Sequence, residues 1–123
     1  EWCPTPAHVL KDGKFLLSIG TPGGYGIAQT TAQMLMHVVD YGMSIQQAIE
    51  APRFKCTISR RVEMEERFSP EVRAELTRRG HQVDLLEPWS RGVGGAQGIL
   101  VDPEAGSFSG GAGPRRDGYA LGW

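Results

Sequence analysis

Gly20-Thr21-Pro22-Gly23-Gly24-Tyr25-Gly26 is the stretch that decides the fold of this chain. The apolar run 15–19 precedes it and is typical of a buried strand, and from Ile27 onward apolar residues recur at helical spacing. The sequence therefore predicts a strand, a glycine-rich loop and a helix. Glycine adopts backbone angles that other residues avoid, and unpaired N–H groups at a helix N-terminus carry partial positive charge. Such a loop suits an anion, or an oxygen that becomes negative during a reaction.

The glycine spacing in residues 20–26 excludes two familiar phosphate-binding loops. It does not follow the dinucleotide-binding fingerprint, and no Lys-Ser or Lys-Thr pair follows it as a P-loop requires. The alternative to an anion site is a strand-to-helix turn without chemistry. Spacing alone leaves both interpretations open.

The composition describes an ordinary globular chain of about one domain. It has 123 residues, of which 40% are hydrophobic and 22% charged. The 13 basic and 14 acidic residues give a net charge of -1, so no strong field recruits nucleic acid or an anionic membrane. No apolar run is long enough for a membrane span, and no signal-peptide pattern is visible.

The two cysteines and the first residues carry less information. Cys3 and Cys56 form no metal-binding pattern, and their spacing does not decide between a disulfide and two free thiols. The sequence opens with Glu1-Trp2 rather than Met, which we interpret as a cleaved or excised polypeptide. The 17 glycines cluster in 20–26, 92–98 and 106–118, which predicts long shaped loops between strands.

Strand and helix signals alternate along the whole chain and predict an α+β fold. Asp12-Gly13 between two short strands indicates a hairpin. Serine caps followed by helical patterns start helices after Ser44 and Ser69. The predicted strands are 7–11, 15–19, 62–65 (an edge strand), 81–86, 96–102 and 107–111, and the predicted helices are 27–41, 45–51 and 70–79.

Four polar residues outside the glycine loop admit simple interpretations. His8 lies in the first strand and has no triad partner nearby in sequence, so we expect a structural or exposed side chain. Arg53 follows a helix end, where it either binds a carboxylate or forms a structural ion pair. We expect Arg115 and Arg116 to pair locally with the neighbouring Asp117.

Several motifs in order resemble the C-terminal part of the γ-glutamyltransferase family, also known as γ-glutamyltranspeptidases or glutathione hydrolases. The resemblance runs from about residue 4 to the end. The segments that carry it are Pro6 to Lys14, Gly20-Thr-Pro-Gly-Gly24, Gln29-Thr-Thr31, Asp40-Tyr-Gly-Met43, Glu50-Ala-Pro-Arg-Phe54, Gly80-His81 and Gly111 to Tyr119.

The resemblance implies part of an N-terminal-nucleophile hydrolase with a four-layer α-β-β-α sandwich. Residues 1–123 would be the C-terminal portion of the small, catalytic subunit of a self-cleaving precursor. In this family the N-terminal threonine of the small subunit attacks a γ-glutamyl amide, its α-amino group serves as base, and the acyl group passes to water or an amino acid. No threonine precedes Thr5, so the nucleophile and the large subunit lie outside this chain.

The resemblance also assigns site residues. Gly23 and Gly24 correspond to the two glycines whose N–H groups form the family's oxyanion hole, the donors that stabilise the tetrahedral oxygen. Trp2 and Cys3 fall where the family has two serines that hold the substrate carboxylate, and neither side chain reproduces those hydroxyl contacts. Gly113 replaces an aspartate of the family pattern.

The departures and the missing nucleophile leave three functions open. The first is a γ-glutamyl amide hydrolase or transferase acting on substrates such as glutathione, and the second is a cephalosporin-acylase-like amidohydrolase. The third is a structural or binding module without catalysis. We expect no cofactor and no metal, partners in the rest of the small subunit and the large subunit, and association of the isolated chain. Family members are often periplasmic or extracellular.

Overall fold

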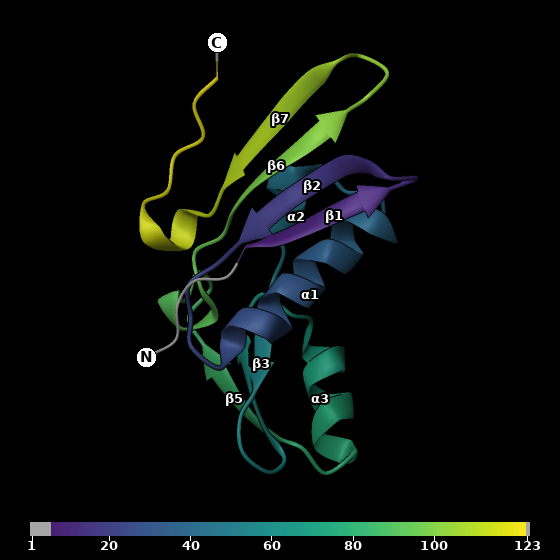
Figure 1. The fold of residues 1–123 in the computed structure, drawn as a ribbon. Coiled ribbons are helices and arrows are strands. Elements are labelled where there is room, and N and C mark those ends of the chain that lie inside the picture. The colour runs from purple at the N-terminus through teal and green to yellow at the C-terminus, as the bar shows by residue number, and fades with distance from the viewer. Residues whose placement is uncertain (1–5, 123) are drawn as a thin grey trace.

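The computed structural model describes residues 6–122 and contains two β-sheets with helices packed around them (Figure 1). This arrangement confirms a mixed α and β fold, while the complete four-layer sandwich stays a prediction. The elements are β1 (Ala7–Lys11), β2 (Lys14–Gly20), α1 (Gly26–Val39), α2 (Ile45–Glu50), β3 (Phe54–Cys56), β4 (Arg61–Glu65), α3 (Pro70–Arg78), β5 (Gln82–Leu86), η1 (Arg91–Val93), β6 (Gln97–Asp102), β7 (Ser107–Ala112) and η2 (Pro114–Arg116).

The larger sheet has four antiparallel strands in the order β1-β2-β6-β7. The predicted hairpin joins β1 to β2, and Asp12 and Gly13 both have positive φ angles in its turn. β6 and β7 come from the far end of the sequence, and β6 pairs with β2 through Leu17 and Leu100. The end of β2, where the glycine loop begins, therefore lies beside the start of β6.

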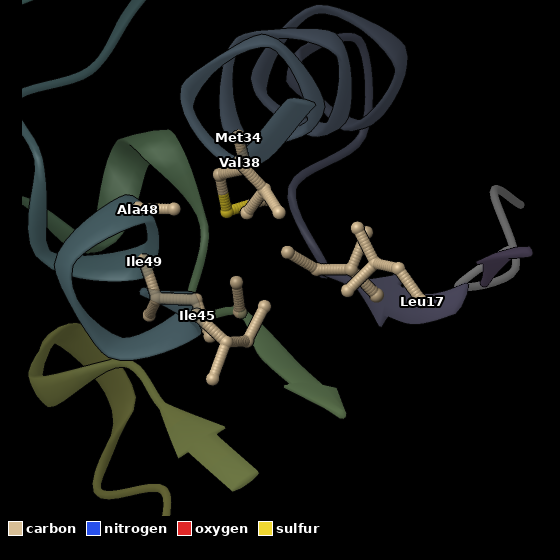
Figure 2. Packing of buried hydrophobic residues seen from close by; sticks show 8 residues of the cluster. Leu17, Met34, Val38, Ile45, Ala48 and Ile49 are labelled. Carbon is tan, nitrogen blue, oxygen red and sulfur yellow. The ribbon is translucent and has the colours of Figure 1, made fainter. Parts of the chain in front are cut away.

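The core lies between one face of this sheet and helices α1 and α2 (Figure 2). Alternate residues of β2 point into it, and the helical stripe of α1 meets them. The buried members are Leu17, Ile19, Met34, Val38, Ile45, Ala48, Ile49 and Ala96. The packing fixes the direction of α1, whose first residue follows the glycine loop.

Helix α2 begins as its sequence predicts and packs directly on two glycines of the sheet. The Ser44 hydroxyl accepts the Gln47 N–H, and the Gln47 side chain accepts the Ser44 N–H, which completes a capping box. A Cβ atom on Gly98 would lie 2.9 Å from Ile45 Cδ1, and one on Gly111 would lie 3.0 Å from Ile49 Cδ1. The absence of side chains there lets α2 approach β6 and β7 closely.

Among residues 6–122 no helix packs against the opposite face of the four-stranded sheet (Figure 1). Ile99 is 49% exposed and Phe108 is 74% exposed on this face. The C-terminal segment crosses part of it, because a Cβ atom on Gly110 would lie 3.2 Å from Ala120 Cβ. Apolar side chains therefore remain exposed on a sheet face that is covered in layered folds.

The smaller sheet has the order β3-β4-β5, with β4 antiparallel to β3 and parallel to β5. The predicted edge strand was wrong, because β4 is the central strand. The alternation Val62-Glu63-Met64-Glu65 indicated one polar face, but Glu65 is fully buried and Glu63 pairs with Lys55 at 3.0 Å. The two glutamates are accommodated in a central strand because both form ion pairs inside the fold.

Candidate active site around the glycine loop

The glycine loop turns from the end of β2 into the first turn of α1. Gly23 has φ 145° and Gly24 has φ 56°, both in the region that favours glycine. The Gly26 N–H donates to the Gly23 carbonyl at 3.0 Å, and the Ile27 N–H donates to the Gly24 carbonyl at 3.1 Å. The carbonyls of both glycines are thus turned into the helix.

The amides of Gly23 and Gly24 remain available. Among residues 6–122 neither N–H group has a hydrogen-bond partner. They lie at the positive end of a 14-residue helix, whose N-cap residue Tyr25 makes no side-chain capping bond. Two unpaired donors at this position match the requirement for binding a negative oxygen.

A second loop, residues 90–95, packs against the glycine loop. Thr21 is buried, its hydroxyl donates to the Pro22 carbonyl at 3.0 Å, and it accepts the Gly95 N–H at 3.1 Å. A Cβ atom on Gly94 would lie 2.1 Å from Thr21 Oγ1 and 2.7 Å from the Pro22 carbonyl oxygen. Only glycine fits at this contact, so residue 94 belongs to the site although it lies 70 residues from Gly24 in sequence.

Two grooves open on either side of the glycine loop. The first, of about 510 Å³, lies on the strand side and includes Gly20, Thr21, Gln97 and Arg116 in its lining. The second, of about 610 Å³, runs along the first turns of α1 from Gly24 and is lined mainly by apolar side chains. The loop therefore separates a polar groove from an apolar one.

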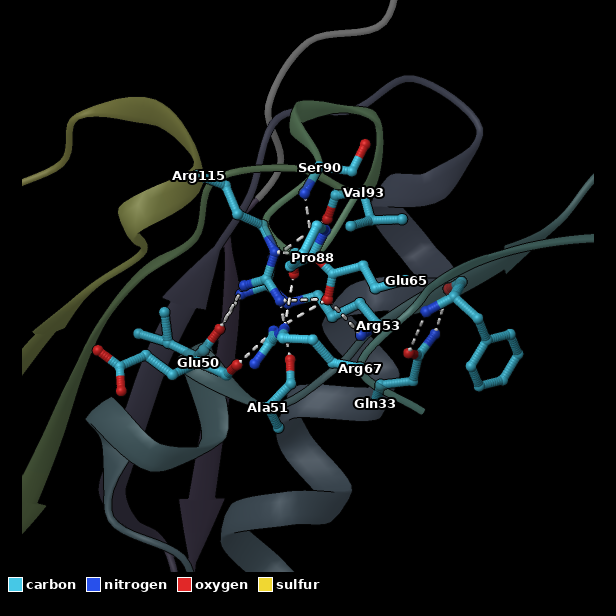
Figure 3. A network of polar contacts seen from close by, with 12 residues as sticks. Gln33, Glu50, Ala51, Arg53, Glu65, Arg67, Pro88, Ser90, Val93 and Arg115 are labelled. Carbon is cyan, nitrogen blue, oxygen red and sulfur yellow. Dashed lines mark hydrogen bonds and ion pairs between the residues drawn. The ribbon is translucent and has the colours of Figure 1, made fainter. Parts of the chain in front are cut away.

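A buried carboxylate, Glu65 of β4, organises the region next to the loop (Figure 3). Arg115 binds it through Nε and Nη2, each at 2.7 Å, and Arg67 binds it at 3.0 Å. The backbone N–H groups of Arg53 and Ser90 donate to it at 3.0 and 3.1 Å. Five donors surround one carboxylate. Glu65, Arg53, Arg67 and Arg115 are called the Glu65 cluster below.

The arginines of the Glu65 cluster also hold the end of α2. Each donates to at least one carbonyl of residues 49–51, at distances between 2.5 and 2.9 Å. These are carbonyls that a helix end leaves without intrahelical partners. Arg53 further donates to the Val93 carbonyl at 3.1 Å, which ties the cluster to the loop behind the glycine loop.

Burial and charge shift the ionisation of the cluster in opposite directions. Burial raises the pKa of Glu65, but the hydrogen bonds from Arg115 and the Arg53 amide lower that pKa further, so it ends below its ordinary value. Burial and the nearby Arg115 lower the pKa of Arg53 to about 9, although Glu65 opposes the shift. Both groups are charged at neutral pH.

The structure corrects or completes four sequence interpretations. Arg115 does not pair with Asp117, because η2 turns its side chain inward to Glu65, and Arg116 instead donates to the Arg91 carbonyl at 2.9 Å. Arg53 binds carbonyls through its side chain rather than a carboxylate. His8 is exposed, with its ring 5.8 Å from that of Phe15.

Other predicted site residues lie outside the described part of the chain. Trp2 and Cys3 precede residue 6, so their proposed substrate contacts stay predictions. Cys56 is an exposed free thiol. Within residues 6–122 no group of three His, Cys, Asp or Glu side chains is placed to hold a metal ion. No helix in the same range has the length and hydrophobicity that crossing a bilayer requires.

A sequence profile described as Gamma-glutamyltranspeptidase matches residues 3–123, nearly the whole chain. The chain belongs to the γ-glutamyltranspeptidase family. A glutathione hydrolase proenzyme of Escherichia coli (strain K12) is 37% identical over 90% of this chain and 18% of its own length. The acylase ACY 1 proenzyme of Pseudomonas sp. (strain SE83) is 35% identical over 92% of this chain and 19% of its own.

The fold comparison agrees with the family. The crystal structure of cephalosporin acylase from Bacillus halodurans matches with a TM-score of 0.90 and 31% identity, over 96% of this chain and 22% of that chain. Family relatives of this chain are therefore hydrolases and acylases, some of them made as proenzymes. The chain spans about a fifth of the length of these three relatives.

Proposed function

We propose that this chain forms part of an amidohydrolase or acyltransferase and supplies its oxyanion hole through the amides of Gly23 and Gly24. The observation that carries the proposal is the pair of N–H groups at the start of α1 that have no partner within residues 6–122, held in place by Thr21 and Gly94. Membership of the γ-glutamyltranspeptidase family supports it. Oxyanion donors of this kind act because they are already oriented before charge develops.

The proposed reaction is the cleavage of a γ-glutamyl amide such as glutathione. A threonine outside this chain attacks the amide carbonyl, and its α-amino group takes the hydroxyl proton. The carbonyl oxygen becomes negative in the tetrahedral intermediate, where the two glycine N–H groups stabilise it. As the intermediate collapses, the C–N bond breaks and the amine leaves with the proton that the α-amino group had taken. A threonyl acyl-enzyme remains, which water or an amino acid then attacks.

A second candidate is an acylase that accepts a different acyl group. The similarity to cephalosporin acylase and to acylase ACY 1 favours it, as does the replacement of the two family serines by Trp2 and Cys3. The oxyanion role of the loop would be the same in this enzyme. A non-catalytic module is the third candidate, and it requires that the complete precursor never generates an N-terminal threonine.

The partner that we propose for this chain is the rest of its own precursor. In the described part of the chain, the sheet face that carries Ile99 and Phe108 is free of helices and exposes both side chains. A second sheet packed on that face would complete the layered sandwich of the family. The isolated chain should therefore associate in gel filtration, whereas a monodisperse monomer would contradict this arrangement.

The decisive test of the oxyanion hole removes one N–H group and leaves every side chain in place. Glycolic acid in place of Gly24, introduced by cell-free synthesis of the full-length precursor, replaces the amide with an ester. This change is cleaner than Gly24→Pro, because proline does not reach the φ of 56° at this position. We expect kcat for a γ-glutamyl anilide to fall by about 100- to 1000-fold.

Gly42 provides the matched control. It also has a positive φ, its N–H has no hydrogen-bond partner among residues 6–122, and it lies at the other end of α1. The same ester at Gly42 should leave kcat unchanged. Equal activity of the Gly24 ester and the parent, with both proteins fully self-processed, would overturn the role given to the loop. Activity on acylase substrates alone would select the second candidate.

A further inference from the structure

Two glutamines of α1, Gln29 and Gln33, bind the backbone of β3 as a neighbouring strand would. The Gln29 amide donates to the Cys56 carbonyl at 3.0 Å and accepts the Cys56 N–H at 2.7 Å. Gln33 makes the same pair of bonds with Phe54, at 2.8 and 3.2 Å (Figure 3). Since β3 also pairs with β4, these side chains attach the first two turns of α1 to the smaller sheet.

Gln29 makes one further contact, which reaches the glycine loop. Its Nε2 donates to the Tyr25 carbonyl at 3.2 Å, whereas the corresponding bond of Gln33 goes to the Gln29 carbonyl at 3.1 Å, inside the helix. Tyr25 is the N-cap residue of α1 and directly follows Gly24. Both N–H groups and the oxygen of the Gln29 amide therefore have partners, which fixes the orientation of this amide.

Gln29 is connected to the Gly24 N–H through two planar peptide groups. The C=O and N–H of one peptide group turn together, because the group is planar. The peptide between Tyr25 and Gly26 accepts a hydrogen bond from Gln29 and donates its N–H to the Gly23 carbonyl at 3.0 Å. That carbonyl belongs to the same peptide group as the Gly24 N–H. The direction of the Gly24 N–H therefore depends on a chain of hydrogen bonds that begins at Gln29.

We propose that Gln29 is a positioning residue, which keeps the Gly24 N–H directed at the substrate oxygen. The inference rests on the proposed function, in which this N–H is one of two oxyanion donors. Such donors are effective because they are oriented before charge develops. Thr21 has the equivalent relation to the other donor, because its hydroxyl donates to the Pro22 carbonyl, which shares a peptide group with the Gly23 N–H. Each proposed donor thus has a side chain that orients its peptide group.

The test is a double-mutant cycle between Gln29 and the Gly24 amide in the full-length, self-processed enzyme. Gln29→Met keeps an unbranched side chain and removes its hydrogen bonds, and glycolic acid at position 24 removes the donor that Gln29 orients. The values of kcat and KM for the γ-glutamyl anilide are measured for the parent, each single change and the double change. Gln33→Met is the matched control, because it loses the same pair of bonds to β3 without a contact to Tyr25.

For Gln29→Met we expect kcat to fall about 10- to 100-fold and KM to stay within about twofold, because alignment matters only once the oxygen becomes negative. In the Gly24 ester the same substitution should change kcat by less than about twofold, since the donor that it orients is gone. Gln33→Met should lower the unfolding temperature but leave kcat within about twofold in both backgrounds.

Equal losses of kcat in the two backgrounds, or no loss in either, would overturn the inference while leaving the proposed function in place. Equal losses for Gln29→Met and Gln33→Met would overturn it in the same way. Gln29→Glu gives a second measurement, since it keeps an acceptor for the Cys56 N–H but loses both donors, and its loss of kcat should also depend on the Gly24 amide. If the Gly24 ester alone leaves kcat unchanged, the proposed function fails, and Gln29 then has no donor to position.

Discussion

The glycine loop and the Glu65 cluster lie close together and treat their polar groups in opposite ways. In residues 20–26 the amides of Gly23 and Gly24 have no partner in the described part of the chain, and grooves open on both sides. In the Glu65 cluster five donors meet one carboxylate that is fully buried.

This difference distinguishes polar groups that are available to a ligand from polar groups that stabilise the fold. A buried polar atom without a partner is costly, so a fold retains one only where something else is gained or where water reaches it. Both carboxylate oxygens of Glu65 already have their partners within the chain, whereas Arg53 Nε of the same cluster has none among residues 6–122. The unpaired amides of the glycine loop still have donors to offer, which supports their proposed role toward a substrate oxygen.

The largest expected effect comes from breaking the cluster at its centre. Glu65→Gln leaves the buried Arg115 and the partly buried Arg67 without their counter-charge and directs an NH₂ group at an arginine. Removal of one partner from a buried ion pair costs about 3–5 kcal/mol. Hydrogen exchange in the processed enzyme measures this loss of stability locally, because the Arg53 and Ser90 amides donate to the carboxylate. The protection of these two amides against exchange should fall by the factor that corresponds to the lost free energy.

Glu75→Gln is the matched control for that substitution. Glu75 also binds two arginines, Arg78 at 2.6 Å and Arg79 at 2.7 Å, but on the exposed surface of α3. Loss of the Glu75 charge should lower the free energy of unfolding far less, because water screens both ion pairs. Equal destabilisation by the two variants would contradict the special role given to burial.

The pH dependence of stability should show the same contrast. Hydrogen bonds lower the pKa of Glu65 in the folded protein, so its contribution is complete above the carboxyl pKa of the unfolded chain. That contribution is lost as the pH falls through the lower, folded-state pKa. Acid unfolding followed by circular dichroism should therefore show a flatter acid limb in Glu65→Gln. An unchanged acid limb would mean that Glu65 does not titrate in this transition.

The next prediction tests whether residues 90–95, which contact the glycine loop, are as rigid as the Glu65 cluster. In Gly94→Ala the new Cβ atom meets Thr21 Oγ1 at 2.1 Å and the Pro22 carbonyl at 2.7 Å, at a φ of 94°. Left-handed strain costs about 1–2 kcal/mol for a non-glycine residue and overpacking adds about 1–3 kcal/mol. The thermal unfolding temperature and kcat should fall together, because the glycine loop must shift.

Gly106→Ala isolates the strain from the clash. Gly106 has φ 63° and open space around its Cβ position, in the turn between β6 and β7. It should lose about 1–2 kcal/mol of stability and no activity. A Gly94 variant that behaves like the Gly106 variant would show that the loop yields without consequence.

Sequence reasoning predicted the parts of this fold that depend on local patterns. The helix after Tyr25, the capping box at Ser44 and the turn at Asp12-Gly13 follow from periodicity and from residues that satisfy their own backbone. The glycine loop at the end of β2 follows from the same signals. The oxyanion role proposed for it comes from the family resemblance, because spacing alone does not distinguish a turn from an anion site.

Long-range polar pairing was not predictable in the same way. Glu65 and Arg115 are 50 residues apart, and nothing local marks either as buried. Their charges favoured an edge strand and a pairing with Asp117, and both interpretations failed for that reason. Gly94 is similar, since the cluster of glycines at 92–98 indicated a shaped loop but not its contact with Thr21.

A smaller effect comes from the rim of the Glu65 cluster. The Arg67 guanidinium lies 3.6 Å from the centroid of the Trp89 ring, and Trp89 is 42% exposed. Trp89→Leu keeps an apolar side chain but removes the cation–π contact, which is worth about 0.5–2 kcal/mol. Thermal unfolding should show a loss in that range, with Trp89→Phe recovering part of it. A loss as large as that of Glu65→Gln would mean that the aromatic ring, not the carboxylate, organises the cluster.

The smallest effect is expected at an unpaired hydroxyl beside the glycine loop. Thr30 and Thr31 are adjacent in α1 and both buried, but the Thr30 hydroxyl donates to the Gly26 carbonyl at 2.7 Å, whereas Thr31 Oγ1 has no partner among residues 6–122. Valine has the same shape as threonine without the hydroxyl. Thr30→Val should cost about 1 kcal/mol, the net worth of one hydrogen bond, and Thr31→Val should be neutral or slightly stabilising. Thermal unfolding of the two variants gives the comparison directly. If Thr31→Val proves as costly as Thr30→Val, the hydroxyl has a partner in the complete enzyme, and it belongs with the satisfied groups of the fold. If stability is kept but activity on the γ-glutamyl anilide falls, Thr31 belongs with Gly23 and Gly24 among the groups held for a ligand.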